Sequence, residues 1–305
     1  MRVERTSLPR VLIVGGAGYF GARLAEALSV DHAVTITQRS SSAVRNAWIA
    51  RTGVSSVHFD SATMKTIDAT GAFEAIINLA MPTAAEAARD PAAAMQRALT
   101  TAGACVRLLD EGRAQRLLHF STFHVYGAGG RACFHETDVP APIHPYGHTH
   151  LACEQRFEED ERVWMVRPSN MVGAPAHADL GDQAKLLFVD LCQQAAHGAM
   201  RLHNDGLSYR DFLPFEDAIH AVRLLLTARP SSVRLFNLAQ GAAMRLDEAA
   251  RLIQVAAPAL PTLEFGTGTD AFRQPFMIDI ERLQQLGWQP GASLTAEASR
   301  LVKFF

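Results

Sequence analysis

The sequence predicts a doubly wound α/β fold built on a parallel sheet. Short apolar runs alternate with longer amphipathic stretches through the first half of the chain. The short runs are continuously apolar, which is typical of strands that are buried on both faces. Strands that alternate with helices favour a parallel sheet covered on both sides. The right-handed crossover rule leaves few topologies for such a sheet, and the doubly wound one is the commonest.

The expected elements can be placed along the chain. Strands are expected at Val11–Val14, Ala33–Thr37, Ser55–Phe59, Ala75–Leu79, Leu117–Phe120 and Val163–Val166, with helices at Phe20–Ser29, Ser42–Arg51, Pro91–Glu111 and Pro145–Glu159. A mixed region follows, with helices at Gly181–Gly198, Phe215–Thr227, Leu246–Ala256 and Leu294–Phe304 and strands at Met200–His203, Arg210–Leu213 and Leu235–Leu238. We therefore expect a first domain over residues 1–172, to which 212–238 return, and a smaller region over 173–305.

Composition and charge narrow the class of protein. The 305 residues are 48% hydrophobic and 20% charged, as in an ordinary globular protein, and the formal net charge is −2. Because no long run of Lys and Arg occurs, neither nucleic acid nor an anionic membrane is expected as a partner. No stretch approaches the roughly 18 consecutive apolar residues of a membrane span, and polar Met1–Arg10 is unlike a secretory signal. Scattered cysteines indicate reduced thiols, so a cytoplasmic protein is expected.

A glycine-rich turn follows the first expected strand. Its glycines fit the GxGxxG spacing at positions 16, 18 and 21 and the GxxGxxG spacing at 15, 18 and 21. Glycines let the backbone approach a diphosphate without Cβ clashes, and the helix that follows offers amide groups and a partial positive charge. We therefore predict a Rossmann-type dinucleotide site whose diphosphate contacts Gly15, Gly16, Gly18, Tyr19, Phe20 and Gly21. The alternative is a tight strand–helix turn without a ligand.

The end of the second expected strand indicates which dinucleotide is bound. A carboxylate there would accept a hydrogen bond from the free ribose 2′-hydroxyl of NAD. The chain instead has Arg39 and Ser40 after Thr37 and Gln38. A guanidinium suits a 2′-phosphate, with which it forms charge-assisted, fork-shaped contacts. NADP is therefore the predicted cofactor, and NAD is the alternative if Arg39 is only a solvated loop charge.

Three further motifs carry a family resemblance. They are Phe120-Ser121-Thr122-Phe123-His124-Val125-Tyr126-Gly127, Tyr146-Gly147-His148-Thr149-His150 and Arg167-Pro168-Ser169-Asn170. Together they resemble the extended short-chain dehydrogenase/reductase family, the group of NAD(P)-dependent sugar-nucleotide epimerases, dehydratases and ketoreductases. The resemblance continues at Asp60, Asn78-Leu79-Ala80, Arg210-Asp211-Phe212, Asp217 and Asp279–Trp288. It implies that Asp60, Leu79 and Ala80 contact the cofactor.

Tyr146 matches the catalytic tyrosine of that family, and the resemblance implies that Tyr146 and His150 also contact the cofactor. Reduction of a carbonyl needs a proton for the emerging alkoxide, and a phenol can donate it, although its ordinary pKa of about 10 hinders ionisation. The resemblance implies a lysine four residues later, on the same helix face, that lowers this pKa. The chain has His150 there, which can bond the nicotinamide ribose but is mostly neutral at pH 7. A slower enzyme, a shifted pH profile or loss of hydride chemistry would follow.

Other residues of these motifs are candidates for the substrate side of the site. The resemblance implies that Thr122 bonds the substrate oxygen beside the tyrosine. Asn170 and Arg210 are expected to contact the substrate. Arg210 is the expected contact of its diphosphate, with Arg201 and Arg273 as alternatives. His124 occupies a slot that carries an additional acid or base in related enzymes, so it is either a proton-transfer group or a structural histidine. The acid pair of a 4,6-dehydratase is absent, which disfavours that reaction.

The predicted reaction is the NADP-dependent reduction of a nucleotide-linked keto-sugar, bound between the carboxyl edge of the sheet and the second region. A sugar-nucleotide epimerase is one alternative, and a cofactor-binding protein without catalysis is another, because the lysine is replaced by His150. No metal is expected: His144 and His148 have i, i+4 spacing, but no cysteine or carboxylate completes a zinc set. The resemblance also implies a homodimer that pairs the two long helices Pro91–Glu111 and Pro145–Glu159.

Overall fold

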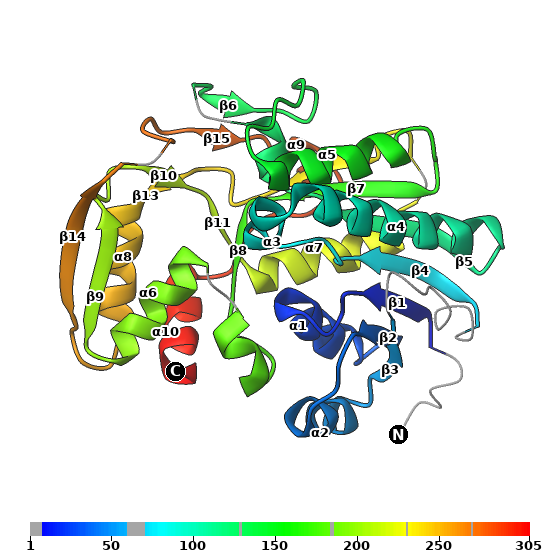
Figure 1. The fold of residues 1–305 in the computed structure, drawn as a ribbon, viewed down its shortest axis with the longest axis horizontal. Coiled ribbons are helices and arrows are strands. Elements are labelled where there is room, and N and C mark those ends of the chain that lie inside the picture. The colour runs from blue at the N-terminus through cyan, green and yellow to red at the C-terminus, as the bar shows by residue number, and fades with distance from the viewer. Residues whose placement is uncertain (1–7, 60–70, 128–129, 184–185, 230, 270) are drawn as a thin grey trace. The chain divides into compact units, whose positions relative to one another are not determined.

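The chain folds into two compact units. The computed structural model describes residues 8–59, 71–127, 130–183, 186–229, 231–269 and 271–305 (Figure 1). Unit 1 comprises Met1–Gly127, Pro140–Arg167 and Leu225–Leu235. Unit 2 comprises Ala128–Val139, Pro168–Leu224 and Phe236–Phe305. Each unit is therefore assembled from segments that are separated in the sequence.

A seven-stranded sheet runs in the order β12-β7-β5-β4-β1-β2-β3. Its strands are β1 (Arg10–Val14), β2 (Ala33–Gln38), β3 (Ser55–His58), β4 (Phe73–Asn78), β5 (Ala114–Phe120), β7 (Val163–Pro168) and β12 (Leu235–Leu238). The pairings from β3 through β7 are all parallel. The strand order reverses at β1, which lies between β2 and β4. The predicted doubly wound fold is therefore confirmed, and the reversal point is where such sheets bind ligands.

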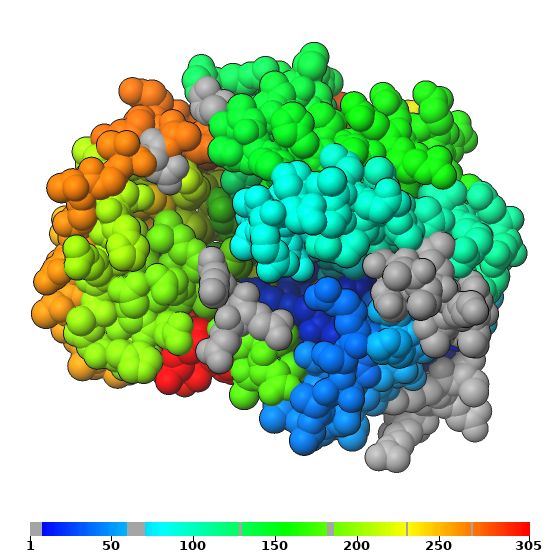
Figure 2. All heavy atoms as spheres, in the orientation of Figure 1, coloured from blue at the N-terminus to red at the C-terminus, as the bar shows by residue number. Residues whose placement is uncertain are grey.

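The helices of unit 1 begin at clear sequence signals. They are α1 (Tyr19–Leu28), α2 (Ala43–Thr52), α3 (Ala84–Arg89), α4 (Pro91–Asp110) and α5 (Pro145–Phe157). Ser42, Thr83 and Asp90 each accept a backbone hydrogen bond in the first turn that follows them. Pro91 and Pro145 occupy the first helical position, where proline lacks only an N–H that would be unpaired. α3, α4 and α5 contact one another and form a continuous surface in cyan and green (Figure 2).

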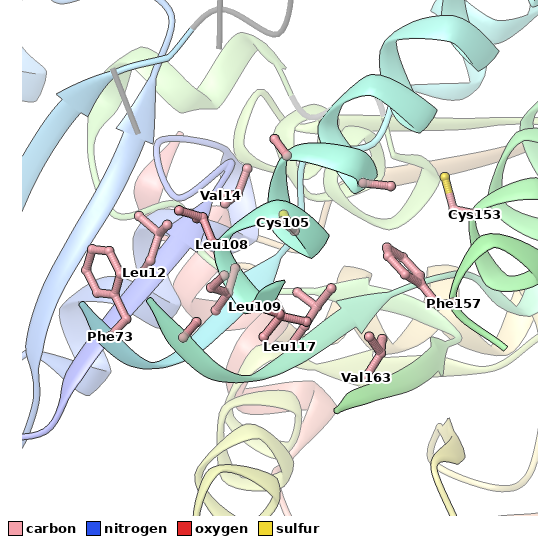
Figure 3. Close-up of a cluster of buried hydrophobic side chains, with 14 of the residues drawn as sticks. Leu12, Val14, Phe73, Cys105, Leu108, Leu109, Leu117, Cys153, Phe157 and Val163 are labelled. Atoms are coloured by element: carbon pink, nitrogen blue, oxygen red, sulfur yellow. The ribbon is translucent and has the colours of Figure 1, made fainter. Parts of the chain in front are cut away.

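A buried core joins the sheet of unit 1 to α4 and α5 (Figure 3). Leu12 and Val14 of β1 both point into it, because side chains two positions apart leave a strand on the same face. Leu117 of β5, Leu108 of α4 and Phe157 of α5 complete the contact and are fully buried. Full burial of each such side chain contributes about 1.5–3 kcal/mol. This packing fixes α5, the helix that carries Tyr146, against the sheet.

Unit 2 is built from short strand pairs and helices. In the described part of the chain its parallel pairs are β8 (Asn170–Val172) with β11 (Phe212–Pro214), β9 (Ala199–Asn204) with β14 (Thr262–Gly268), and β6 (Cys133–Phe134) with β15 (Met277–Ile278). β10 (Tyr209–Arg210) and β13 (Met244–Arg245) pair antiparallel. The helices are α6 (Leu187–Ala196), α8 (Leu246–Ala256), α9 (Glu281–Gln285) and α10 (Leu294–Phe304), and α7 (Phe215–Thr227) begins in this unit.

Two expected elements differ from the prediction. The helix expected over Gly181–Gly198 is a 3-10 turn at Ala178–Gln183 followed by α6. A Cβ at Gly181 would lie 3.1 Å from a ring carbon of Phe304, so the glycine allows a close approach but weakens the helix. The strand expected over Arg210–Leu213 divides at Asp211, because β10 pairs with β13 while β11 pairs with β8. The helices α3 and α9 and the strands β6, β8, β13, β14 and β15 were not predicted.

Two expectations concern the chain as a whole. The cysteines Cys105, Cys133, Cys153 and Cys192 are all free thiols. Among the residues that the structure describes, no helix combines the length and the hydrophobicity that a membrane span requires. Asp60, an expected cofactor contact, lies outside the described residues.

Candidate active site

The glycine turn after β1 is shaped by close backbone approaches. Gly15 has a φ of 84°, and a Cβ there would lie 2.9 Å from the Ala80 nitrogen at the end of β4. A Cβ at Gly21 would lie 2.5 Å from the Gly15 carbonyl oxygen. The Gly15 N–H donates to Thr37 Oγ1 at 2.8 Å, which ties the turn to β2. Glycine is thus required where β1 and β4 meet, at the reversal point of the sheet.

The start of α1 suits a diphosphate. Its N-cap residue is Gly18, which contributes no side-chain hydrogen bond. The helix begins at Tyr19, and its first turn carries the partial positive charge of the helix dipole. A backbone cradle that side chains would fill, placed before a helix N-terminus, has the features that bind the diphosphate of a dinucleotide. The residues present therefore fit the predicted cofactor.

Arg39 and Ser40 form an exposed corner after β2. Nη1 of the buried Arg45 donates to the Ser40 carbonyl at 2.5 Å and shapes this loop. Arg39 also acts on Glu86 of α3. Although partial burial raises the pKa of the Glu86 carboxyl, hydrogen bonds with Thr83 and the charges of Arg97 and Arg39 bring it below its usual value. The Arg39 charge thus lies near the start of α3 as well as at the end of β2.

The structure brings Thr122, His124, Tyr146 and His150 together in unit 1. Thr122 and His124 belong to a 3-10 turn at Phe123–Tyr126 that follows β5, and Tyr146 and His150 belong to α5. The Tyr146 ring contacts two imidazoles, with its centroid 5.7 Å from that of His124 and 4.5 Å from that of His150. Thr122 Oγ1 accepts a hydrogen bond from the His124 N–H at 3.3 Å. The phenol of Tyr146, the hydroxyl of Thr122 and the imidazoles of His124 and His150 therefore form one cluster of side chains.

Two glycines that the sequence analysis did not single out allow this approach. A Cβ at Gly147 would lie 2.7 Å from the His124 carbonyl oxygen, so α5 can pack closely on the turn only without a side chain there. Gly127 has a φ of 85°, and a Cβ there would lie 2.0 Å from the Ala141 carbonyl oxygen. Each glycine directly follows a tyrosine in the quoted motifs, and this was the signal available in the sequence.

Burial sets the protonation of the site. Burial raises the pKa of the Tyr146 phenol, and a side-chain hydrogen bond with Thr122 offsets part of that rise. Burial, and then the nearby His119 and His124, lowers the pKa of His150 well below its usual value. At neutral pH the phenol keeps its proton and the His150 ring is neutral. Among the described residues, the site therefore contains a proton donor and no ammonium at the position that follows Tyr146 by one helical turn.

A buried ion pair ties α5, the helix that carries Tyr146, to the end of β7. Arg167, at the end of β7, donates from Nε to Glu154 Oε1 at 2.9 Å and from Nη2 to Glu154 Oε2 at 2.6 Å. Both side chains are buried, and the guanidinium carbon lies 4.7 Å from the ring centroid of Tyr126. Sequence reasoning missed this pair. The signal was a glutamate on the expected helix and an arginine at the end of the sixth expected strand, which only the fold brings together.

The remaining candidates, Asn170 and Arg210, belong to unit 2. The Asn170 side chain donates to the Asp211 carbonyl at 2.8 Å. Arg210 donates to the Tyr209 carbonyl at 2.8 Å, and its guanidinium carbon lies 5.3 Å from the Phe272 ring centroid. The Asp211 carboxylate accepts from Ser169 Oγ at 2.5 Å and from the amides of Gln240 and Gly241, and burial raises its pKa to about 6. Asp211 therefore organises the backbone that carries both candidates.

Comparison with models of known protein families shows to which family this chain belongs. The model of the NAD dependent epimerase/dehydratase family matches residues 11–239. This chain belongs to that family. The resemblance to extended short-chain dehydrogenases/reductases is thereby confirmed. Within this epimerase/dehydratase-family chain, the match includes the glycine turn, the cluster around Tyr146 and the β12 strand.

Several proteins are similar to this family member. A UDP-glucose 4-epimerase of Azospirillum brasilense is 25% identical to this chain. The alignment extends over 317 residues and covers 95% of this chain and 90% of that protein. The low-salt glycan biosynthesis protein Agl12 of Haloferax volcanii is 24% identical over 198 residues, or 62% of this chain and 61% of that protein. The matched part of this chain thus spans less than two thirds of Agl12.

Solved structures share the fold of this epimerase/dehydratase-family chain. A UDP-N-acetylglucosamine 4-epimerase from Methanobrevibacter ruminantium M1, in complex with UDP-N-acetylmuramic acid, superposes with a TM-score of 0.83 at 18% identity, over 98% of each chain. RMD from Pseudomonas aeruginosa, complexed with NADPH, superposes with a TM-score of 0.79 at 20% identity, over 97% of this chain and 98% of that one. At these identities the likeness establishes the fold.

Proposed function

We propose that the protein is a nicotinamide-dependent reductase of a nucleotide-linked keto-sugar. The observation that carries the proposal is the Tyr146 phenol beside Thr122, with a pKa that burial raises. A carbonyl that receives a hydride needs a proton, and a protonated phenol supplies it. A neutral His150 gives little help in ionising the phenol, which the reverse reaction requires. The protonation of the site therefore favours reduction.

The proposed roles follow from the chemistry of each side chain. Tyr146 donates its phenolic proton to the substrate oxygen, and the Thr122 hydroxyl positions that oxygen by a hydrogen bond. His150 anchors the nicotinamide ribose, and His124 is a further proton-transfer group beside the Tyr146 ring. The Arg167–Glu154 pair keeps α5 in place, because breaking a buried ion pair costs about 3–5 kcal/mol.

The cofactor proposal rests on unit 1. We assign the diphosphate to the turn formed by Gly15, Gly16, Gly18 and Gly21, with Asp60, Leu79 and Ala80 as further contacts. Arg39 and Ser40 read the ribose, and the guanidinium favours NADP over NAD. The family description names NAD, and one similar structure contains NADPH, so both cofactors occur among relatives. When bound, the dinucleotide supplies the hydride.

The substrate proposal assigns the sugar nucleotide to unit 2. Asn170 and Arg210 are the proposed contacts, with Arg210 on the diphosphate. A cytoplasmic homodimer that uses the helices α4 and α5 remains part of the proposal. A small polar substrate agrees with the modest net charge of the chain, which gives no sign of a polyanionic partner.

A sugar-nucleotide epimerase is the second candidate function. The Azospirillum brasilense relative and the Methanobrevibacter ruminantium structure are both UDP-sugar 4-epimerases, and this likeness supports epimerisation in the same site. His124 is the proposed base for that reaction, because its ring lies 5.7 Å from that of Tyr146. A cofactor-binding protein without turnover is the third candidate, since His150 replaces an ammonium.

A turnover assay separates the three candidates. Stoichiometric oxidation of NADPH by UDP-linked 4-keto-sugars is expected for the reductase. Interconversion of UDP-sugar isomers without net cofactor change would instead identify an epimerase, and tight dinucleotide binding without either reaction would identify a binding protein. Tyr146→Phe should lower kcat by about 100-fold to 10,000-fold and leave dinucleotide affinity unchanged. Tyr209→Phe, which removes a phenol in unit 2, is the control and should keep full activity.

A further inference from the structure

A set of buried polar atoms surrounds His150, and two of its residues, His119 and Ser121, have no role in the proposed chemistry. His119 of β5 is 0% exposed, Ser121 is 4% exposed and His150 of α5 is 2% exposed. Within the described part of the chain, no hydrogen-bond partner exists for His119 Nε2, Ser121 Oγ, or either ring nitrogen of His150. Buried polar groups are nearly always hydrogen-bonded, and each unsatisfied one costs about 1–3 kcal/mol. Each of these atoms therefore requires a hydrogen-bond partner.

Asn78 determines which nitrogen of His119 carries the proton. The Asn78 side-chain oxygen accepts from the Ala80 N–H at 3.1 Å, which leaves its Nδ2 directed at the imidazole. Nδ2 lies 3.1 Å from His119 Nδ1, and because an amide nitrogen only donates, Nδ1 is the acceptor. Burial lowers the pKa of His119 to about 3, so the ring is neutral and its single proton is on Nε2. His119 thus offers a buried N–H donor.

The buried atoms face the same side of the sheet. The His119 ring lies 4.9 Å from the ring of Phe157, which follows His150 by seven residues and so shares its face of α5. His119 is also close enough to His150 to contribute to the lowering of its pKa. The Ser121 N–H donates to the Val166 carbonyl at 2.7 Å and continues the ladder of β5. Ser121 follows His119 by two positions, so both side chains leave β5 on the α5 side.

We propose that one buried water molecule joins His119, Ser121 and His150, and that His119 is a positioning residue for the catalytic cluster. The water accepts from His119 Nε2–H and donates to Ser121 Oγ and to one ring nitrogen of His150. Three hydrogen bonds are the usual number for a buried water. The other ring nitrogen of His150 then carries the proton. A chain from Ala80 through Asn78 and His119 therefore gives His150 a fixed N–H donor beside Tyr146.

This inference rests on the proposed function only for its kinetic consequence, so its first test is spectroscopic. In the full chain labelled with ¹⁵N-histidine, two-bond nitrogen–proton correlations report which ring nitrogen is protonated. We expect one fixed neutral tautomer for His119, with the proton on Nε2, and one for His150. Asn78→Asp places a carboxylate opposite His119 Nδ1 and should move the His119 proton to Nδ1. The proton of His150 should then move to its other ring nitrogen or exchange between the two.

A matched control separates this effect from the general cost of burying a carboxylate. Asn237→Asp changes a buried asparagine of unit 2 that donates to the carbonyls of Phe134 and Asp279, and it should leave both tautomers unchanged. Averaged tautomers of His150 in the unchanged protein would overturn the proposal. The proposal is also overturned if Asn78→Asp changes the tautomer of His119 and leaves that of His150 unchanged.

The kinetic test compares two replacements of His119. His119→Gln keeps an N–H donor near the Nε2 position, whereas His119→Phe removes it and keeps a ring. Loss of one positioning hydrogen bond should lower kcat about tenfold in the Phe variant, with KM unchanged and with recovery in the Gln variant. Equal rates for the two variants contradict a positioning role. If the unchanged protein turns over no substrate, the proposed function fails. The tautomers of His119 and His150 still test whether a water molecule links the two residues.

Discussion

The rings of Tyr146 and His150 lie one turn apart on α5, with centroids 4.5 Å apart and planes inclined at 61°. Burial raises the pKa of the phenol and lowers that of the imidazole, so two neutral rings meet where the family resemblance implies an ammonium beside a phenol. The pair holds a phenolic proton at neutral pH. The phenol is therefore in the protonated state that proton donation to a substrate requires.

Restoring a lysine should test this relationship. In His150→Lys, an ammonium next to the phenol favours its ionised form, so the pH at which alcohol oxidation reaches half its maximal rate should fall by about one unit or more. The pH profile of kcat/KM in the oxidising direction measures this shift. His148→Lys is the control, because His148 is exposed on the same helix and should leave the profile unchanged. An identical profile for His150→Lys would remove His150 from the reacting cluster.

Arg39 should decide between the two dinucleotides. Arg39→Ala removes the charge that suits a 2′-phosphate and should weaken NADPH binding about 10-fold to 100-fold, or about 1.4–2.7 kcal/mol. NADH binding should change little, because its ribose carries no phosphate. Fluorescence titration of both dinucleotides measures the ratio. Arg51→Ala, an exposed change in α2, should alter neither affinity, and equal losses for NADPH and NADH in Arg39→Ala would contradict the NADP assignment.

The glycine turn should not tolerate a methyl group. Gly21→Ala would place a Cβ 2.5 Å from the Gly15 carbonyl oxygen, so backbone must shift and the free energy of unfolding should fall by about 1–3 kcal/mol. Dinucleotide affinity should fall as well. Gly103→Ala is the matched control, because nothing lies within 4 Å of its added Cβ and α4 should gain about 0.5–1 kcal/mol. Denaturant unfolding and dinucleotide titration check both, and a Gly21→Ala protein that binds normally would exclude the turn as the diphosphate site.

Stability should depend on pH through His119. Burial lowers its pKa to about 3, whereas an unfolded histidine titrates at about 6.5, so the unfolded chain binds more protons as the pH falls below 6.5. His119 therefore costs up to about 1.4 kcal/mol of stability per pH unit over that range, and nothing above it. His119→Gln should remove this slope between about pH 6 and 4.

The comparison with His119→Gln isolates one group among several. Burial raises the pKa of Asp211 to about 6, so Asp211 contributes with the opposite sign and favours the folded state as the pH falls. This contribution is the same in both proteins and cancels in the difference. Denaturant unfolding at a series of pH values gives that difference. Parallel curves for the two proteins would show that His119 binds protons equally in the folded and unfolded states.

Much of the fold could be predicted from the local spacing of apolar residues in the sequence. The bounds of α7, β12, α8 and α10 agree with the prediction, because their apolar residues repeat with the helical or strand period. The glycine turn, Tyr146 and Thr122 were found for a related reason: their chemistry is written in short motifs with fixed spacing. The short strands β6, β8, β13 and β15 were not predicted, because two or three residues have no measurable period, and the longer strand β14 was not predicted either.

The protonation of the site was decided by tertiary structure. The motif shows a histidine in place of a lysine. Only its burial on α5 shows that this histidine is neutral and that, among the described residues, its ring nitrogens have no hydrogen-bond partner. Asn78 and His119 are 41 positions apart, and Arg167 and Glu154 are 13 apart. Both contacts exist because β4, β5 and β7 lie side by side under α5. Desolvation and pairing across such distances depend on which strands become neighbours, and local sequence does not contain that information.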